Sequence, residues 1–314
     1  MRFIGQFFTI ALVGCALLVS CRPVDVVSPS EGERPRIVAT TSIVGDMVRR
    51  VGGDDIRLQV LVPPKADPHD YIFRPADMVV AADADLLFIN GGGLEGHLDR
   101  LLKGVARPEQ IVSLVQGIPM RHFEGAHHHA HGDDCGDSAD LDPHVWTDPN
   151  HVMIWAETIS RALSQLAPEY AEAFSARAEE LIEDLRELDV WIEEQVAVVP
   201  PERRLLVTDH YAMGYFAERY GFEEAGVVIR SLDSAAQPSA RDLVRLIDEL
   251  KARQIPAIFV GMSVNPQLAR QIARDSGVSL VPLYSGALSE SDGPAADYFA
   301  YMRYNVLALV EHLQ

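Results

Sequence analysis

Arg36-Ile37-Val38-Ala39-Thr40-Thr41 is a short run of mostly apolar and β-branched residues, and Ser42 follows it directly. Such a run, bounded by a polar residue, is typical of a buried strand. Ser is one of the best side chains for accepting a hydrogen bond from the first turn of a helix. We therefore predict a strand over 36–41 and a helix that Ser42 caps and that ends at Gly52-Gly53. A strand that leads straight into a helix is the repeating unit of α/β folds.

The same alternation extends outward from this unit in both halves of the chain. In the first half we expect further strands over 56–62 and 86–90, with a helix over 74–82 between them. In the second half we expect strands over 204–208, 225–229, 257–260 and 279–282, and helices over 213–220, 239–253, 266–276 and 295–313. Strands that alternate with helices pair in parallel. The predicted fold class is therefore α/β, with two parallel-sheet lobes.

Two helices are predicted between the halves, and the second is unusually long. The first covers 150–166, and the second runs from Pro168 to about 197, where Pro200-Pro201 stops it. At 1.5 Å per residue the second helix would be roughly 43 Å long. One small domain does not require such a length, so we interpret it as a helix that joins two lobes. The predicted organisation is a signal peptide at 1–20, a tether at 21–35, an N-terminal lobe at 36–166, a linking helix at 167–199 and a C-terminal lobe at 200–314.

The N-terminus has the pattern of a secretory signal. Arg2 is followed by an almost entirely apolar run over 3–19, which is shorter than the ~20 residues that a spanning helix needs. Leu18-Val19-Ser20-Cys21 resembles the bacterial lipobox, in which the signal is cut before a cysteine that carries lipid. We predict lipid attachment at Cys21, which anchors the chain on the extracytoplasmic (periplasmic) side of the bacterial cytoplasmic membrane. The alternative is an ordinary signal with an incidental cysteine.

Composition excludes several classes of protein. The 314 residues include 27 Lys and Arg against 46 Asp and Glu, a net charge of −19. So acidic a surface repels phosphate backbones, and we expect no nucleic-acid partner. Apolar residues make up 48% of the chain, which excludes a disordered or fibrous protein. Cys15 leaves with the signal and Cys21 carries lipid, so Cys135 alone remains and no intrachain disulfide is expected.

Histidines are concentrated in one stretch and at three separate points. Five lie in the Gly-rich loop 122–135, which we interpret as a weak metal-collecting arm, with a plain solvated loop as the alternative. His69 and His144 each follow an Asp-Pro pair, and His210 follows Asp209 at a predicted strand end. Ligands gather beyond the carboxyl ends of parallel strands, and a neighbouring Asp can hold an imidazole ring. Singly each is more often a structural histidine, but together they are candidate metal ligands.

Several motifs match one known family. They are Thr41-Ser42-Ile43-Val44-Gly45-Asp46, Val62-Pro63-Pro64 with Asp67-Pro68-His69, Asp83-Ala84-Asp85 through Gly93-Leu94-Glu95, Asp142-Pro143-His144-Val145-Trp146 with Asp148-Pro149, Gly214-Tyr215-Phe216 with Arg219-Tyr220-Gly221, and Tyr301-Met302-Arg303-Tyr304-Asn305. From the lipobox onward, the chain resembles the lipid-anchored zinc- and manganese-binding proteins (cluster A-I) that deliver metal to ABC importers. The resemblance implies two α/β lobes joined by one long helix, with the metal in the cleft between them.

The resemblance also implies which residues bind the metal. His69 and His144 match ligands of the first lobe, and His210 matches a third position that is His in zinc-type members and Glu in many manganese-type ones. The fourth position is usually Asp, but this chain has Gly286 there. Gly261 stands where the family often has Glu, so both departures remove negative charge from the second lobe's side of the cleft.

The remaining ligands favour zinc as the cargo. Imidazole suits Zn²⁺, whereas carboxylate and water suit Mn²⁺. We expect water in the fourth place, with Glu290 or Asp292 as alternatives from a segment expected to be flexible. The predicted function is a monomeric solute-binding protein that captures extracytoplasmic Zn²⁺ and delivers it to an ABC permease, without catalysis. The alternatives are the same role with Mn²⁺, a zinc hydrolase, whose H-E-x-x-H signature is absent, and a secondary adhesin role.

Overall fold

A computed structural model describes residues 34–96, 107–122, 141–231, 238–262 and 266–314. The predicted signal peptide, Cys21 and nearly all of the tether lie outside these residues, as does the His-rich loop apart from His122. Among the described residues, no helix combines the length and the apolar character needed to cross a bilayer.

The N-terminal lobe is built on a four-stranded parallel sheet in the order β2-β1-β3-β4. Its strands are β1 (Arg36–Ala39), β2 (Arg57–Val60), β3 (Leu86–Ile89) and β4 (Ile111–Ser113), and its first helices are α1 (Ser42–Gly52) and α2 (Pro75–Ala82). Thr41, and not the predicted Ser42, caps α1, since its side chain accepts a hydrogen bond from Val44 N. The last strand, β4, was not predicted.

The C-terminal lobe repeats this architecture with a parallel sheet in the order β6-β5-β7-β8. Its strands are β5 (Leu205–Thr208), β6 (Glu223–Val227), β7 (Ala257–Gly261) and β8 (Ser279–Leu283), and its helices are α6 (Gly214–Tyr220), α7 (Ala240–Ala252), α8 (Gln267–Ser276) and α9 (Tyr298–Leu313). β6 begins two residues earlier than predicted. The predicted fold class of two parallel-sheet α/β lobes is confirmed.

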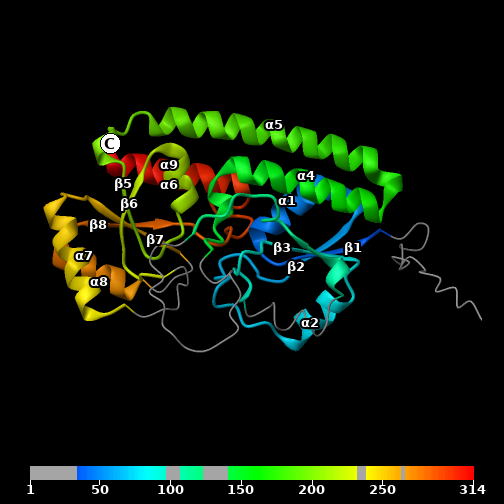
Figure 1. Ribbon diagram of the computed structural model, residues 1–314, viewed down its shortest axis with the longest axis horizontal. Coiled ribbons are helices and arrows are strands. Elements are labelled where there is room, and N and C mark those ends of the chain that lie inside the picture. Colours follow the sequence, from blue (N-terminus) through cyan, green and yellow to red (C-terminus); the bar gives the residue numbers. More distant parts are fainter. Residues whose placement is uncertain (1–33, 97–106, 123–140, 232–237, 263–265) are drawn as a thin grey trace, which may run out of the picture.

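Two antiparallel helices connect the lobes. α4 (Pro149–Leu166) packs beneath α5 (Ala171–Val196), and α5 extends along the top of both lobes (Figure 1). Phe88 of β3, Leu185 of α5 and Phe259 of β7 belong to the same cluster of buried apolar side chains. The two lobes therefore share one core, while separate smaller clusters lie on the α2 side and on the α7–α8 side.

Polar contacts fix α5 to each lobe. Arg177 donates to the carbonyls of Val51 and Gly52, at 3.2 and 2.9 Å, at the end of α1. Further along the helix, Asp189 accepts hydrogen bonds from Arg219 and from the Tyr220 hydroxyl of α6. The helix is thus attached to the first lobe at one end and to the second lobe at the other.

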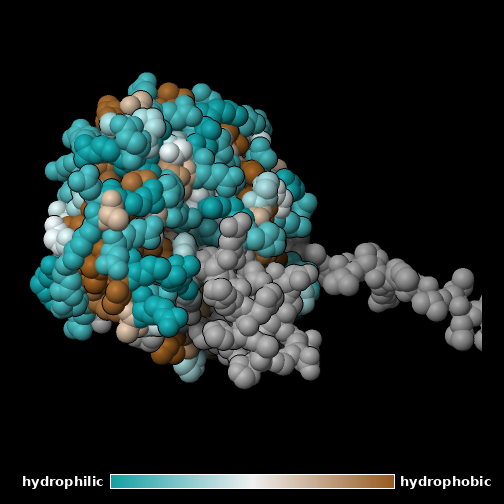
Figure 2. Space-filling model, turned by 60° about the vertical axis from the view of Figure 1, so that its left-hand side comes forward, coloured by the Kyte–Doolittle hydropathy of each residue, from teal (hydrophilic) through white to brown (hydrophobic). Residues whose placement is uncertain are grey.

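The outer surface is mostly hydrophilic, as Figure 2 shows for one face of the molecule. Large apolar side chains that are exposed, such as Ile72 and Val244, belong to different elements. This surface agrees with the acidic composition of the chain.

Candidate metal centre

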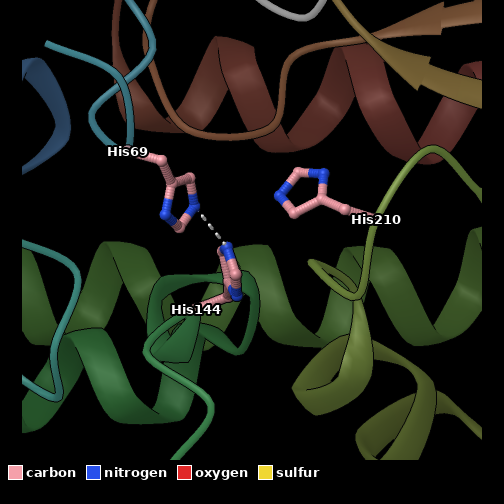
Figure 3. A group of neighbouring side chains, drawn as sticks. All are labelled: His69, His144 and His210. Atoms are coloured by element: carbon pink, nitrogen blue, oxygen red, sulfur yellow. Dashed lines mark hydrogen bonds between the residues drawn. The ribbon is translucent and has the colours of Figure 1, made fainter. Parts of the chain in front are cut away.

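The three candidate histidines come from three separate segments and meet between the lobes. His69 lies in the loop between β2 and α2, His144 lies just before the helical turn Val145–Thr147 that leads into α4, and His210 lies two residues beyond β5. Figure 3 shows their rings turned toward one another. One nitrogen from each ring lies within 4.8 Å of the other two. The sequence therefore identified residues that the fold brings together.

The geometry suits a metal ion. Nε2 of His69 and Nε2 of His144 are 3.0 Å apart, joined by a hydrogen bond. Ligand nitrogens about 2.0–2.1 Å from a tetrahedral zinc ion are roughly 3.3–3.4 Å apart from each other. A metal ion can therefore replace this hydrogen bond with little movement of either ring. His144 and His210 are only 1% and 2% exposed, and His69 is partly buried, so the three rings are largely shielded from bulk solvent.

Asp142 orients His144. Its Oδ1 lies 2.8 Å from the ring Nδ1 and also accepts a hydrogen bond from His144 N. With Nδ1–H donated to this carboxylate, Nε2 of the neutral ring keeps its lone pair for the centre of the site. The Tyr215 hydroxyl of α6 donates to Asp142 O, so the second lobe also supports this loop.

Beside His210 lies Asp209, which faces Nδ1 of that ring as a neighbouring charge and not as a hydrogen-bond partner. Its Oδ1 is 3.3 Å from His210 Nδ1, and its Oδ2 accepts a hydrogen bond from Gly261 N. A Cβ atom at Gly261 would collide with Ser285 Oγ and lie 3.2 Å from Asp209 Oδ2. Glycine at this position thus leaves room for the carboxylate that faces His210.

His69 is held differently. Its backbone N donates to Asp67 Oδ1 at 3.0 Å. Its ring is hydrogen-bonded only to His144 within the described part of the chain. No carboxylate there orients the His69 ring as Asp142 orients that of His144, so the position of this ring depends on its loop.

Burial and neighbouring charge change the pKa values of the rings. Burial, and then the nearby His144 and His210, hold the pKa of His69 well below its ordinary value. Burial also lowers the pKa of His144, although Asp142 opposes it. Burial would lower the pKa of His210, but the charge of Asp209 outweighs it, and the pKa is raised. His69 and His144 are therefore neutral at pH 7 and ready to bind metal, and the Asp209 charge favours a cation near His210.

The candidates for a fourth ligand lie elsewhere. Among the described residues, no carboxylate belongs to the group formed by the three histidines. Glu290 and Asp292 are exposed, in a turn closed by Ser289 N donating to Ala295 O and by Gly293 N donating to Glu290 O. In the structure this segment is a hydrogen-bonded turn.

Sequence reasoning missed the residues that support the site from a distance. Trp146 Nε1 donates to Ser285 O at 3.0 Å and to the Tyr301 hydroxyl at 3.1 Å. The Tyr298 hydroxyl donates to Trp146 O. Trp146 and Tyr301 both belong to the family motifs, but no pattern in the sequence indicated that they meet at Ser285.

The chain is similar to proteins that bind metals. A family model described as the periplasmic zinc-uptake complex component A matches residues 37–312. The manganese-binding lipoprotein MntA of Halalkalibacterium halodurans is 31% identical, with 98% of each chain covered. Two solved structures are each 26% identical to this chain. The periplasmic zinc-binding protein TroA of Treponema pallidum has a TM-score of 0.80, covering 90% of this chain and 99% of its own. A Mn-bound periplasmic metal-binding protein of Candidatus Liberibacter asiaticus has a TM-score of 0.76, covering 88% and 99%.

Proposed function

The chain belongs to the family of the periplasmic zinc-uptake complex component A, and we propose that it binds a divalent metal ion between its lobes for delivery to an ABC permease. The resemblance stated from the motifs is confirmed. The family and the relatives are solute-binding proteins of ABC transporters and not enzymes, so the hydrolase alternative is set aside.

The observation that carries the proposal is the group of three imidazoles between the lobes. His69, His144 and His210 would bind the ion through one ring nitrogen each. The carboxylates of Asp142 and Asp209 support two of these rings, which is the arrangement usual around metal-binding histidines. Cargo must also leave again, and a site made of three loops at a lobe boundary can open when those loops separate.

We propose Mn²⁺ as the cargo. The relative MntA, at 31% identity, is named as a manganese-binding lipoprotein. A solved relative with the same fold is described as Mn-bound. These names favour the alternative given in the sequence analysis over its first choice, which was Zn²⁺.

Zn²⁺ is the second candidate, because of the donor atoms. Three imidazole nitrogens with no carboxylate among the grouped ligands suit Zn²⁺ better than Mn²⁺, which prefers oxygen. The zinc-binding protein TroA has the same fold. Delivery of either ion requires the same role as a solute-binding protein.

The proposal also includes anchoring. The relative MntA is named a lipoprotein, which supports lipid attachment at Cys21 and a periplasmic location on the membrane. We propose that the chain works there as a monomer and that its macromolecular partner is the permease.

Metal analysis separates the two cargoes. The mature protein is purified without added metal, and its metal content is measured by mass spectrometry. Competition calorimetry with Mn²⁺ and Zn²⁺ follows on metal-free protein, and transport-deficient cells carrying the gene are scored for uptake of each ion. We expect one equivalent of metal in the unmodified protein and its loss in a His144→Ala variant. Protein that binds neither ion contradicts the proposal.

A further inference from the structure

The loop that carries His69 rests on a segment of the other lobe. We call residues 284–289 the bridging segment. Lys65 N donates to Leu288 O at 3.0 Å, and Leu288 N donates to Ser42 Oγ at 3.0 Å. Leu288 of the C-terminal lobe is thus hydrogen-bonded to the N-terminal lobe through both its backbone N–H and its carbonyl oxygen.

The bridging segment is itself firmly held, by α9 of its own lobe and by Trp146 of the other. Asn305 of α9 accepts from Tyr284 N at 2.9 Å and donates to Tyr284 O at 2.7 Å. Ser285 O accepts hydrogen bonds from Trp146 Nε1 and from the Tyr301 hydroxyl. The backbone on the N-terminal side of Gly286 is therefore fixed and cannot easily yield to a neighbour.

Gly286 lies directly against the loop of His69. A Cβ atom at Gly286 would lie 2.8 Å from Pro68 Cδ and 2.9 Å from Pro68 Cγ. Pro68 is buried and immediately precedes His69. The φ angle of Gly286 is outside the left-handed region, so what this position requires of its residue is space.

The same loop contains an unusual backbone conformation, which a hydrogen bond to the bridging segment helps to maintain. Lys65 has a φ of +64°, which is unusual for a residue other than glycine. It is the third residue of the turn closed by Ala66 N donating to Pro63 O. Such conformations persist where surrounding contacts impose them, and the hydrogen bond from Lys65 N to Leu288 O is one such contact.

Taken together, these contacts give His69 the support that its own ring lacks. His144 and His210 each have a carboxylate beside Nδ1, but His69 depends on Pro68 and on the loop around it. We propose that Gly286 is a positioning residue for His69: its missing side chain lets Pro68 seat against the bridging segment, and this contact places the His69 ring at the metal. The proposal rests on the proposed function of the three histidines as metal ligands.

A double-mutant cycle tests the proposal with Zn²⁺ as the probe. In Gly286→Ala, the new methyl group pushes Pro68 and the His69 ring away, and we expect Zn²⁺ affinity to fall by about tenfold or more, the cost usual for loss of a supporting group. Pro68→Ala removes the ring atoms that the methyl group would meet. In the Pro68→Ala background, Gly286→Ala should therefore cost no more than about twofold, because the steric cause is gone. Gly96→Ala is the matched control, since a Cβ there meets nothing within 4 Å.

Two further readouts separate positioning from general destabilisation. The absorption bands of bound Co²⁺ should change in Gly286→Ala and should return toward those of the Pro68→Ala protein in the double variant. The midpoint of thermal unfolding without metal is measured for all variants. If Gly286→Ala does not fold, the Zn²⁺ affinities of Pro68→Ala and the double variant are compared instead. A difference of more than about twofold between them would contradict the steric explanation.

Two outcomes would overturn the inference. One is a Gly286→Ala protein with unchanged Zn²⁺ affinity. The other is a Gly286→Ala substitution that lowers Zn²⁺ affinity equally in the unmodified protein and in the Pro68→Ala background. Failure of the proposed function gives a different result, because the unmodified protein would then bind neither Zn²⁺ nor Mn²⁺, or His69→Ala would bind metal as tightly as the unmodified protein.

Discussion

At the scale of single residues, the site combines two kinds of support. The carboxylate of Asp142 holds His144 through a hydrogen bond, while the carboxylate of Asp209 lies 3.3 Å from His210 Nδ1 as a neighbouring charge. His69 is instead placed through backbone contacts that reach it from the other lobe. The two kinds of support predict different consequences for substitutions.

Each histidine should be essential for tight metal binding. Replacing His69, His144 or His210 with Ala removes one of three ligands, and each change should weaken Zn²⁺ binding by more than about tenfold, or ~1.4 kcal/mol. Isothermal calorimetry on metal-free protein measures this. His312→Ala is the control, since that ring is bonded to Ala308 O in the last helix. A variant whose affinity equals that of the unmodified protein would show that its histidine is not a ligand.

Asp142→Asn should weaken binding while leaving the fold intact. The amide oxygen can still accept the hydrogen bond from His144 Nδ1, but it carries no charge to strengthen the ring as a donor to the metal. We expect a loss of about 10–100-fold in Zn²⁺ affinity. Asp248→Asn, at an exposed position on α7, serves as the control. Equal affinity in both variants would mean that the charge of Asp142 does not act on the site.

The sequence predicted the histidines but not the contacts that support them from far away. Asp-Pro pairs and strand ends marked His69, His144 and His210 because these signals are local. Trp146 and Ser285 are 139 residues apart, and no local pattern reports that they meet. The steric demand at Gly286 was also invisible, since it arises from a proline on the other lobe.

At the scale of elements, helix boundaries followed from capping and proline signals, while short edge strands did not. α5 starts after Pro168 and ends before Pro200, close to the predicted limits. β4 has only three residues, all partly exposed, and its apolar pair Ile111-Val112 is too short to reveal a buried strand in the sequence. It exists because its backbone pairs with β3.

The contact of α5 with α6 should contribute to stability in a pH-dependent way. Burial raises the pKa of Asp189, but hydrogen bonds from Arg219 and Tyr220 and the charge of Arg219 outweigh it, and the pKa is lowered. A lowered pKa in the folded state gives stability above the unfolded value of about 3.9, and this stability is lost as pH falls below it. Asp189→Asn should therefore destabilise the protein by roughly 1 kcal/mol or more at pH 7 and by less near pH 3.

Urea unfolding at both pH values measures this difference. Glu183→Gln is the control on the same helix, because the Glu183–Arg186 pair is exposed and such pairs contribute only about 0–1 kcal/mol. An Asp189→Asn penalty that is the same at pH 7 and pH 3 would contradict the pH argument, and no penalty at all would contradict the structural one.

At the scale of the whole molecule, we expect the metal group to be separable from the His-rich loop. His122 and Leu141 form an isolated antiparallel bridge, so the two ends of the stretch 123–140 lie side by side. The three histidines of the site all lie outside that stretch.

The fold class, two parallel-sheet lobes joined by a long helix, was predictable because it depends on the alternation of apolar runs and caps along the whole chain.

Removal of residues 123–140 and closure by a short glycine linker should leave one tight Zn²⁺ site. Only weaker additional binding should disappear, because a Gly-rich stretch loses conformational entropy each time it closes on an ion. Calorimetric stoichiometry before and after the deletion measures the change, and circular dichroism shows whether the shortened chain folds. Loss of the tight site from a folded protein would assign it to the loop and not to the three histidines.

The shared core has a consequence for how such a chain can evolve. The lobes have nearly the same order of elements and look like two exchangeable halves. Yet Phe88, Leu185 and Phe259 lie in one apolar cluster, and α5 is hydrogen-bonded to both lobes. Recombination that replaced one lobe with that of a relative would leave half of the α5 surface packed against side chains that it does not fit. The two lobes must therefore be inherited together, and a substitution accepted in one selects which substitutions the other can accept.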